Sequence, residues 1–173
     1  MKILAFGAST SSQSINRRLA NHAAGLVPSA TVTDLDLRTL ELPIYSSDEE
    51  EANGIPKAAH EFLETIQSHD AIVVSLAEHN GSYTAAFKNL YDWTSRIEQN
   101  LWSDKPMLLL ATSPGGRGGA TVLAAASETF PRMGADLRAT FSLPSFHDHF
   151  VDSKIVDRKL ASQLEEAVEK LGG

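Results

Sequence analysis

The sequence predicts an α/β fold in which helices cover both faces of a single parallel sheet. Short apolar segments typical of buried strands alternate along the chain with segments whose apolar residues recur at helical spacing. Polar or glycine-rich loops follow three of the expected strands, as they do at the carboxyl edge of such a sheet. We expect one domain over residues 1–173, because this length suits a single core of useful size.

Five strands are expected. Residues 2–6 (KILAF), 71–77 (AIVVSLA) and 106–112 (PMLLLAT) are continuous apolar runs, as buried parallel strands are. Residues 31–37 (TVTDLDL) alternate between polar and apolar, and residues 135–143 (ADLRATFSL) alternate only in part, which indicates an edge strand. Five strands joined by helices suit a three-layer sandwich with the flavodoxin-like order 2-1-3-4-5. In that fold the ligand lies beyond the carboxyl ends of the strands.

Apolar residues at helical spacing mark the helices between and after these strands. They recur in four groups: Ile15, Leu19, Ala23 and Leu26; Phe87, Leu90, Tyr91, Thr94, Ile97 and Leu101; Leu123, Ala126, Phe130 and Met133; and Leu160, Leu164, Val168 and Leu171. Residues 38–56 and 143–153 are the least regular. The acidic run DEEE within 38–56 is expected to be a solvated face, or the first turn of a helix stabilised by its dipole.

Composition excludes several classes of function. The net charge is −7 and no cluster of Lys and Arg is present, which argues against a nucleic-acid partner. The absence of cysteine excludes disulfides, thiolate nucleophiles and cysteine-ligated metals, and is compatible with the cytoplasmic location that we expect. The first residues, MKILAFGAS, hold too few apolar residues for a signal peptide or a membrane span, so no membrane partner is expected.

The loop after the first strand concentrates hydroxyl groups. Five of the six residues from Ser9 to Ser14 are Ser or Thr, and a helical pattern follows directly. Their hydroxyls, with the free N–H groups at the helix start, can surround one phosphate. The alternative is ordinary helix capping, with Ser14 as the N-cap and the rest as a polar linker.

The loops after the third and fourth strands also carry unusual residues. Residues 113–119 (SPGGRGG) hold four glycines in five positions, which would let the backbone approach a flat ligand closely. The run fits neither a Walker A loop nor a dinucleotide fingerprint; the alternative is a flexible loop. In residues 78–82 (EHNGS), Asn-Gly favours a tight turn, and His79 has the alternative of being a plain exposed polar residue. All three loops should meet at one edge of the sheet.

The motifs in these loops resemble those of the NAD(P)H-dependent FMN reductases, which include related quinone, azo and chromate reductases. The family's G-S-L-R-x-x-S-x-N is matched by ASTSSQSIN (8–16), and its P-E-Y-N-x-S-x-P-x-x-L-K-N-x-x-D-W by AEHNGSYTAAFKNLYDW (77–93). Its S-P-G-G-x-G-G is intact at 113–119, and its L-P-x-Y segment is matched by LPIY (42–45). The resemblance covers nearly the whole chain with the spacing preserved.

The resemblance implies an FMN site built from all three loops. It assigns the phosphate to Ser9, Ser11, Ser14, Ile15 and Asn16; the isoalloxazine ring to Ala77, Glu78, His79, Asn80 and Gly81; and the ribityl chain and pyrimidine side to Ser113, Pro114, Gly115 and Gly116. On the following helix, Lys88, Asn89, Asp92 and Trp93 are expected to brace the ring loop rather than to touch flavin. No metal and no catalytic side chain are expected, because the cofactor carries the chemistry.

Some departures of the sequence from the family pattern bear on ligand binding. Ser11 stands where many members carry Arg, Ala77 replaces the first proline of the second motif, the second proline of that motif is also absent, and His79 replaces a Tyr that lies near the flavin. The missing cation is expected to weaken binding of phosphate or NADPH. His79 could tune the ring or donate a hydrogen bond to a quinone oxygen.

The function that the resemblance implies is passage of hydride from NADPH or NADH through FMN to a quinone-like or other small electron acceptor. A homodimer or homotetramer is implied, with four aromatic residues as candidate interface anchors or ordinary core residues: Tyr45, Trp102, Phe146 and Phe150. The alternative is a non-catalytic flavodoxin-like electron carrier. That class presents aromatic residues on both faces of the ring, whereas the ring-side loops here hold Gly, His and Asn.

Two further alternatives are weaker. A hydrolase using Ser9 or Ser75 would need the G-x-S-x-G elbow, and GASTS has Ser11 where the second glycine belongs. His147, Asp148 and His149 could bind zinc or a similar ion, but adjacent loop residues rarely converge on one ion. A polar loop near the cleft or near a partner subunit is the simpler interpretation of that segment.

Overall fold

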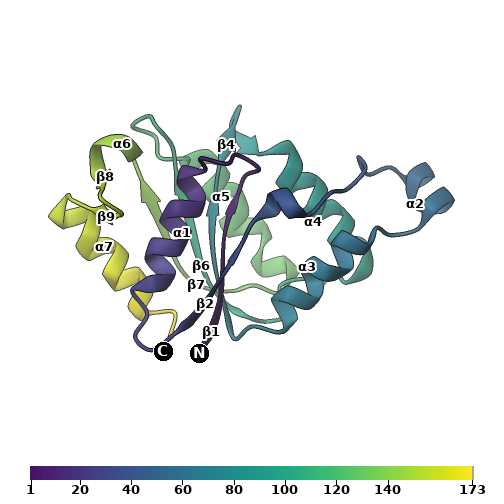
Figure 1. The fold of residues 1–173 in the computed structure, drawn as a ribbon, viewed down its shortest axis with the longest axis horizontal. Coiled ribbons are helices and arrows are strands. Elements are labelled where there is room, and N and C mark those ends of the chain that lie inside the picture. Colours follow the sequence, from purple (N-terminus) through teal and green to yellow (C-terminus); the bar gives the residue numbers. More distant parts are fainter. Residues whose placement is uncertain (173) are drawn as a thin grey trace.

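The fold is a three-layer sandwich around one parallel sheet (Figure 1). The computed structural model describes residues 1–172. The main sheet consists of β1 (Lys2–Ala8), β2 (Thr31–Leu35), β3 (Ala71–Leu76), β6 (Pro106–Thr112) and β7 (Asp136–Leu143). The helices are α1 (Ile15–Gly25), α2 (Ser47–Asn53), α3 (Lys57–Gln67), α4 (Ala85–Ile97), α5 (Ala120–Thr129), α6 (Phe146–His149) and α7 (Arg158–Glu169), with the 3₁₀-helices η1 (Leu37–Thr39) and η2 (Pro131–Met133). Two small hairpins complete the fold: β4 (Glu78–His79) with β5 (Ser82–Tyr83), and β8 (Phe150–Val151) with β9 (Lys154–Ile155).

The strand order of the sheet is β2-β1-β3-β6-β7, with every neighbouring pair parallel. This is the order 2-1-3-4-5 that the sequence predicts. The fifth strand, β7, lies at an edge, as its partial alternation indicates. The central strand β3 is buried along its whole length, which explains why its sequence is a continuous apolar run without alternation.

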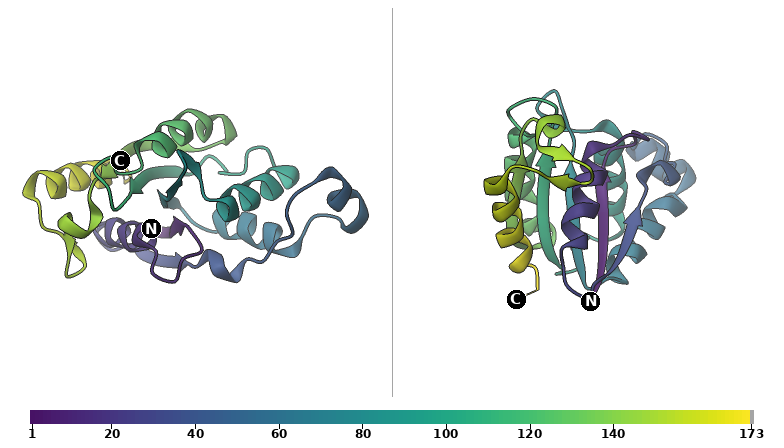
Figure 2. Two further views of the ribbon diagram at one scale, coloured as in Figure 1. Left: turned by 90° about the horizontal axis from the view of Figure 1, so that it is seen from above. Right: turned by 60° about the vertical axis from the view of Figure 1, so that its left-hand side comes forward.

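Two apolar layers enclose the sheet, because successive residues of a strand point to opposite faces. Leu4 and Phe6 of β1 face one layer, which α3, α4 and α5 cover with residues such as Phe62. Ile3 and Ala5 face the other layer, which α1 and α7 cover. The right-hand view of Figure 2 shows α1 and α7 on the near side of the sheet.

The segment before α3 is held by α4. Asn89 donates a hydrogen bond from Nδ2 to the carbonyl of Pro43 at 2.8 Å and accepts one at Oδ1 from the N–H of Tyr45 at 2.9 Å. The indole N–H of Trp93 also donates to the Pro43 carbonyl at 2.8 Å, and the Tyr45 ring packs edge-on against the Trp93 ring. This places α2 as a projection at one end of the molecule (Figure 1).

The acidic run of this segment forms the first turn of α2. Ser46 is the N-cap and accepts the N–H of Glu49 at 3.0 Å, and the first turn carries Asp48, Glu49 and Glu50. No residue of α2 is buried. Both interpretations of the acidic run therefore hold at once: it is a solvated face and a helix start stabilised by its dipole.

Some sequence-based boundaries are wrong. The helical pattern over 83–101 ends in the structure at Ile97, because Glu98 adopts an extended conformation, and Leu101 is buried in the turn that follows. Residues 143–153, expected to be irregular, contain α6 and part of the β8–β9 hairpin. The turn of that hairpin uses Asp152 and Ser153 at φ of 48° and 62°, without the glycine that usually marks such a turn.

Candidate functional site

The loops after β1, β3 and β6 meet at the carboxyl edge of the sheet, beside the label for β4 at the top of Figure 1. A cleft of about 260 Å³ lies among them and is lined by residues of all three loops and by His147. The residues are far apart in the sequence, and the parallel topology alone brings their loops together.

The first loop is folded by its own serines. The Ser9 hydroxyl accepts the N–H of Ser11 at 3.1 Å, and the Ser11 hydroxyl accepts the N–H of Gln13 at 3.2 Å. Ser14 is the N-cap of α1 and its hydroxyl accepts the N–H of Arg17 at 3.1 Å. None of these three hydroxyls donates to another of the described residues. Each O–H hydrogen is therefore available to an acceptor in the cleft.

The start of α1 adds two backbone donors. Ile15 and Asn16 are the first two residues of the helix, and their N–H groups have no partner among the described residues. Helix N-termini carry a partial positive charge that favours anions. Three hydroxyls and two N–H groups without an acidic side chain among them form a set of donors suited to a phosphate.

The side chain of Asn16 has a different role from the one that the sequence suggests. It is buried, and its Nδ2–H donates to the carbonyl of Thr112 at 3.2 Å. Its Oδ1 accepts from the Ser75 hydroxyl at 2.7 Å and from the N–H of Thr112 at 3.1 Å. The side chain thus ties α1 to β3 and β6 beneath the cleft, and only the backbone N–H of Asn16 remains free for a ligand.

Ser75 cannot serve as an exposed nucleophile. Its side chain is fully buried and its hydroxyl is committed to Asn16. Ser9 has no histidine among its hydrogen-bond partners in the described residues. The hydrolase alternative therefore gains no support from the structure.

The second loop is the β4–β5 hairpin. Asn80 and Gly81 occupy its turn at φ of 52° and 76°, which is the tight turn that Asn-Gly favours. Glu78 turns its carboxylate away from solvent, and Oε2 accepts the N–H of Val122 in the first turn of α5 at 2.9 Å. Since the N-cap of α5 is Gly119, which has no side chain, Glu78 supplies the capping oxygen from another loop.

The glycines of the third loop divide into two pairs. A Cβ added at Gly115 or Gly116 would meet no atom within 4 Å, so this pair faces open space. A Cβ at Gly118 would lie 2.3 Å from the hydroxyl oxygen of Ser142, and the φ of Gly118 is 58°. The second pair therefore serves the packing of the chain itself, and the first pair leaves room beside the cleft.

Ten of the fourteen residues predicted to bind the cofactor line the cleft: Ser9, Ser11, Ser14, Ile15, Asn16, Ala77, Glu78, His79, Ser113 and Pro114. The other four, Asn80, Gly81, Gly115 and Gly116, belong to the same loops but do not line it.

Three lining residues were not predicted: Gln13, Thr112 and His147. Gln13 lies inside the hydroxyl run, and Thr112 ends a strand whose following loop is predicted to bind ligand. The positions of Gln13 and Thr112 in the sequence could therefore have identified both as lining residues. His147 comes from α6, and only its place in the HDH motif distinguishes it.

The expected brace on α4 holds a different segment. Asn89 and Trp93 bind Pro43 and Tyr45 rather than the loop of residues 77–81, and Lys88 pairs with Asp92 on the same helix at 2.6 Å. The hairpin is instead held at its end by Thr84, whose hydroxyl donates to the carbonyl of Ala8 at 2.9 Å.

Other candidate roles can now be placed. Trp102, Phe146 and Phe150 are buried in the core, so in this chain they are not exposed interface anchors; Tyr45 is half-buried against Trp93. His147, Asp148 and His149 form the short helix α6, and within residues 1–172 no group of three or more such side chains is arranged to hold a metal. None of the helices described here is both long and apolar enough to cross a bilayer.

Comparison with known proteins identifies relatives of this arrangement. The sequence profile of a family described as NADPH-dependent FMN reductase matches residues 1–148. A quinone reductase of Pseudomonas putida is 36% identical over 108 residues, which is 62% of this chain and 57% of that protein. An NAD(P)H-dependent FMN reductase of Pseudomonas aeruginosa is 35% identical over 119 residues, 68% of this chain and 63% of that protein. The matches thus span about six tenths of the length of these relatives.

Solved structures share the fold. The flavoenzyme NAD(P)H:(acceptor) oxidoreductase of Paracoccus denitrificans superposes with a TM-score of 0.76 at 25% identity, covering 98% of this chain and 94% of that one. An FMN-dependent NADH-azoreductase of Bacillus anthracis, solved in complex with FMN, gives a TM-score of 0.65 at 16% identity over the full length of both chains, a likeness of fold alone.

Proposed function

This chain belongs to the NADPH-dependent FMN reductase family, and from that premise we propose that it is an FMN-binding oxidoreductase. In this proposal it uses NADPH or NADH to reduce a quinone-like or other small electron acceptor. A cytoplasmic location and assembly into a homodimer or homotetramer are parts of the same proposal. Light scattering on the purified protein would measure the assembly.

The observation that supports the proposal most is the donor set of the cleft. The hydroxyls of Ser9, Ser11 and Ser14 and the N–H groups of Ile15 and Asn16 suit the phosphate of FMN in number and in kind. They are five donors, and none of the Lys and Arg residues among residues 1–172 lines the cleft. The residues that line the cleft therefore suit the phosphate of FMN.

The other two loops suit the flat part of the same cofactor. Ala77, Glu78 and His79 would lie along the isoalloxazine ring through their backbone, because the Glu78 carboxylate is already committed to α5. Ser113 and Pro114 would lie along the ribityl chain. Because Gly115 and Gly116 have no side chain and face open space, they would leave room for the ring or for a substrate.

When bound, FMN supplies the capacity to accept a hydride from a dihydronicotinamide and to pass electrons to a second substrate. The residues of this chain bind, orient and shield it, and no side chain is assigned as an essential acid or base. His79 is exposed at the cleft and is the residue we propose to donate a hydrogen bond to a quinone oxygen. His147 lies at the same cleft on α6.

The electron-carrier alternative is not favoured. Among the described residues, no Phe, Tyr or Trp lines the cleft, so the paired aromatic side chains of a flavodoxin are not in place to cover both faces of the isoalloxazine. An uncovered face suits a site that admits two substrates in turn.

Turnover separates the two functions. Protein loaded with FMN is mixed with NADPH or NADH, and oxidation of the nucleotide is followed with and without a quinone. The proposal expects steady oxidation of the nucleotide that the quinone accelerates and that stops when FMN is removed. An FMN-loaded protein that oxidises neither nucleotide would contradict it and would favour the electron carrier.

A further inference from the structure

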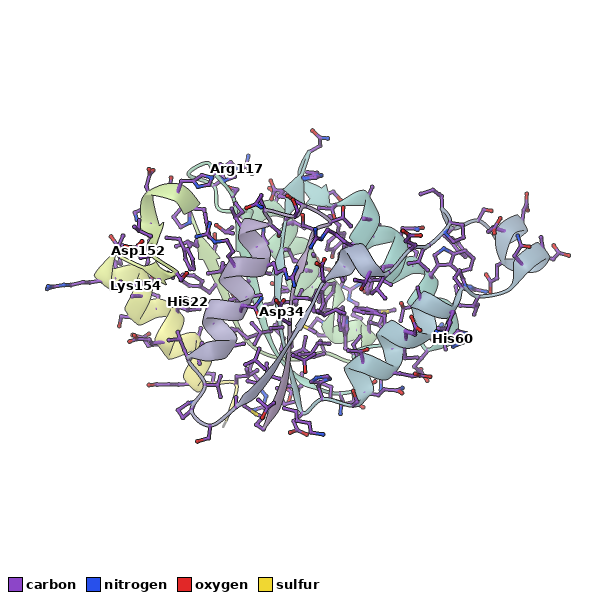
Figure 3. All side chains as sticks on the ribbon, in the orientation of Figure 1. His22, Asp34, His60, Arg117, Asp152 and Lys154 are labelled. Carbon is purple, nitrogen blue, oxygen red and sulfur yellow. The ribbon has the colours of Figure 1, made fainter. Side chains whose placement is uncertain are left out.

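A second pocket adjoins the cleft on the outer side of the first loop. Its volume is about 570 Å³, within the range of small-molecule sites. It lies along α1 and is lined by residues that include Arg18, His22, Asp34 and Phe150. It shares Gln13 and Ser14 with the cleft, so a ligand in this pocket would lie next to a ligand in the cleft. Figure 3 shows His22 beside the hairpin that carries Asp152 and Lys154.

Arg18 is the cation of this pocket that remains open to a ligand. Its guanidinium lies 5.2 Å from the ring centroids of both Phe146 and Phe150, and the two rings stack on each other at 4.8 Å. Among the described residues no acidic side chain pairs with Arg18. The adjacent Arg17, by contrast, is bound to Asp34 at 2.8 Å and to Asp36 at 2.6 Å.

The negative charge of Asp34, the acidic residue of this pocket, is already balanced by neighbouring side chains. The oxygens of Asp34 accept hydrogen bonds from Nε and Nη2 of Arg17 and from the side-chain amide of Asn21. These partners lower the pKa of Asp34 although its burial opposes them. An anion entering the pocket would therefore meet the charge of Arg18 without facing an uncompensated carboxylate.

The rest of the pocket offers flat, weakly polar surfaces. The His22 ring packs edge-on against the Phe150 ring, with centroids 5.3 Å apart. Burial lowers the pKa of His22, which favours the neutral form of its ring. A neutral imidazole and a buried phenyl ring next to a guanidinium suit a ligand that joins an aromatic base to a phosphate.

We propose that this pocket binds the adenosine end of NADPH, and that Arg18 binds its 2′-phosphate and so makes NADPH the preferred nucleotide over NADH. The assignment of the ligand as NADPH rests on the proposed function. The pocket and the position of Arg18 in it are independent of that function. A guanidinium already packed against two rings loses little freedom when it binds a phosphate. The missing arginine at position 11 makes such a cation useful, because Ser11 supplies no charge.

Binding is tested without turnover. Adenosine 2′,5′-bisphosphate is titrated by calorimetry into the protein as purified, into Arg18→Gln and into Arg132→Gln. Arg132 is an exposed arginine paired with Glu128 beyond the opposite end of the sheet, so it controls for net charge. We expect Arg18→Gln to raise the Kd about tenfold or more, as loss of a charged hydrogen bond does, and Arg132→Gln to leave it unchanged. Equal Kd values for Arg18→Gln and wild type, or no binding to wild type, would overturn the proposal.

Kinetics test the specificity. We expect the wild-type protein to prefer NADPH, and Arg18→Gln to lower kcat/KM for NADPH about tenfold while leaving kcat/KM for NADH and the FMN content unchanged. Equal losses with both nucleotides would refute the role of Arg18. If neither nucleotide is oxidised by wild type, the proposed function fails. The calorimetric titration still decides whether the pocket binds the phosphorylated adenosine.

Discussion

At the scale of single residues, the serines of the first loop combine a structural role with the phosphate-binding role that we propose. Ser14 caps α1 and lines the cleft, and Ser9 and Ser11 fold the loop by accepting N–H groups while their own hydrogens stay free. Helix capping and phosphate binding appeared as alternatives in the sequence, yet a hydroxyl accepts with its oxygen and donates with its hydrogen. The same hydroxyl groups can therefore cap the helix and also donate to the phosphate that we propose.

Ser11→Ala is expected to weaken FMN binding about tenfold or more, because a hydroxyl hydrogen bond to a charged phosphate is lost. Fluorescence titration measures the affinity of each protein for FMN. Ser12→Ala is the matched control, since Ser12 lies in the same loop but does not line the cleft. A Ser11→Ala protein that binds FMN as tightly as Ser12→Ala would show that Ser11 is not a phosphate ligand.

Asn16→Ala is expected to lower the free energy of unfolding by about 2–3 kcal/mol, because the N–H of Thr112 and the hydroxyl of Ser75 would stay buried without an acceptor. Urea denaturation measures the loss. Ser75→Ala removes only one of these bonds and should cost about 1 kcal/mol. Equal stability of Asn16→Ala and wild type would mean that the tie beneath the cleft contributes nothing.

At the scale of elements, α4 positions the segment between η1 and α2. Asn89 binds that segment through both atoms of its amide, and Trp93 adds a third hydrogen bond to it. The resemblance associates KNLYDW with the ring loop because the two are neighbours in sequence. Contacts across 44 to 50 residues carry no local pattern, so they could not be predicted from the motif alone.

Asn89→Ala is expected to loosen the 40–56 segment and to speed its cleavage by a glutamate-specific protease, since Glu41 and Glu49 to Glu51 lie there. Cleavage rates and sites are read by mass spectrometry. Lys88→Ala is the control, because within the described part of the chain Lys88 pairs with Asp92 on its own helix and with no residue of the 40–56 segment. If both variants are cut at the wild-type rate, Asn89 does not hold the segment.

Whether an element can be predicted from the sequence depends on the interactions that stabilise that element. The five strands and the helices α1, α4, α5 and α7 follow from apolar periodicity, because each buries a face in one of the two layers. Among the elements that were missed, α6 and the β8–β9 hairpin are short and fixed by contacts such as the stacking of Phe146 on Phe150. The cleft followed from topology, whereas the second pocket depends on side-chain packing around Arg18.

At the scale of the whole molecule, one apolar layer contains a cluster of aromatic rings that buries a titratable group. The Tyr91 ring lies among Tyr83, Phe87, Trp102 and Phe130. Burial, with smaller contributions from Tyr83 and Asp92, raises the pKa of Tyr91 to about 12. The folded state therefore favours the neutral phenol.

Stability should fall as the pH rises from about 10, the pKa of an unfolded tyrosine, to about 12, because only the unfolded state then gains from ionisation. Below pH 10 this contribution is fully present. Tyr91→Phe should show a shallower loss of unfolding free energy over this interval than wild type does, as measured by urea denaturation at a series of pH values. Identical pH profiles would show that Tyr91 ionises as freely in the folded protein as in the unfolded chain.

The central claim is that the three loops at the carboxyl edge of the sheet hold FMN. It is tested most directly by the visible absorption spectrum of the purified protein, followed by heat release and identification of any flavin. We expect a yellow protein that releases FMN, or one that becomes yellow when FMN is added. A colourless protein that fails to bind added FMN would contradict it, and the serine loop would then be only a helix cap or a site for another phosphorylated ligand.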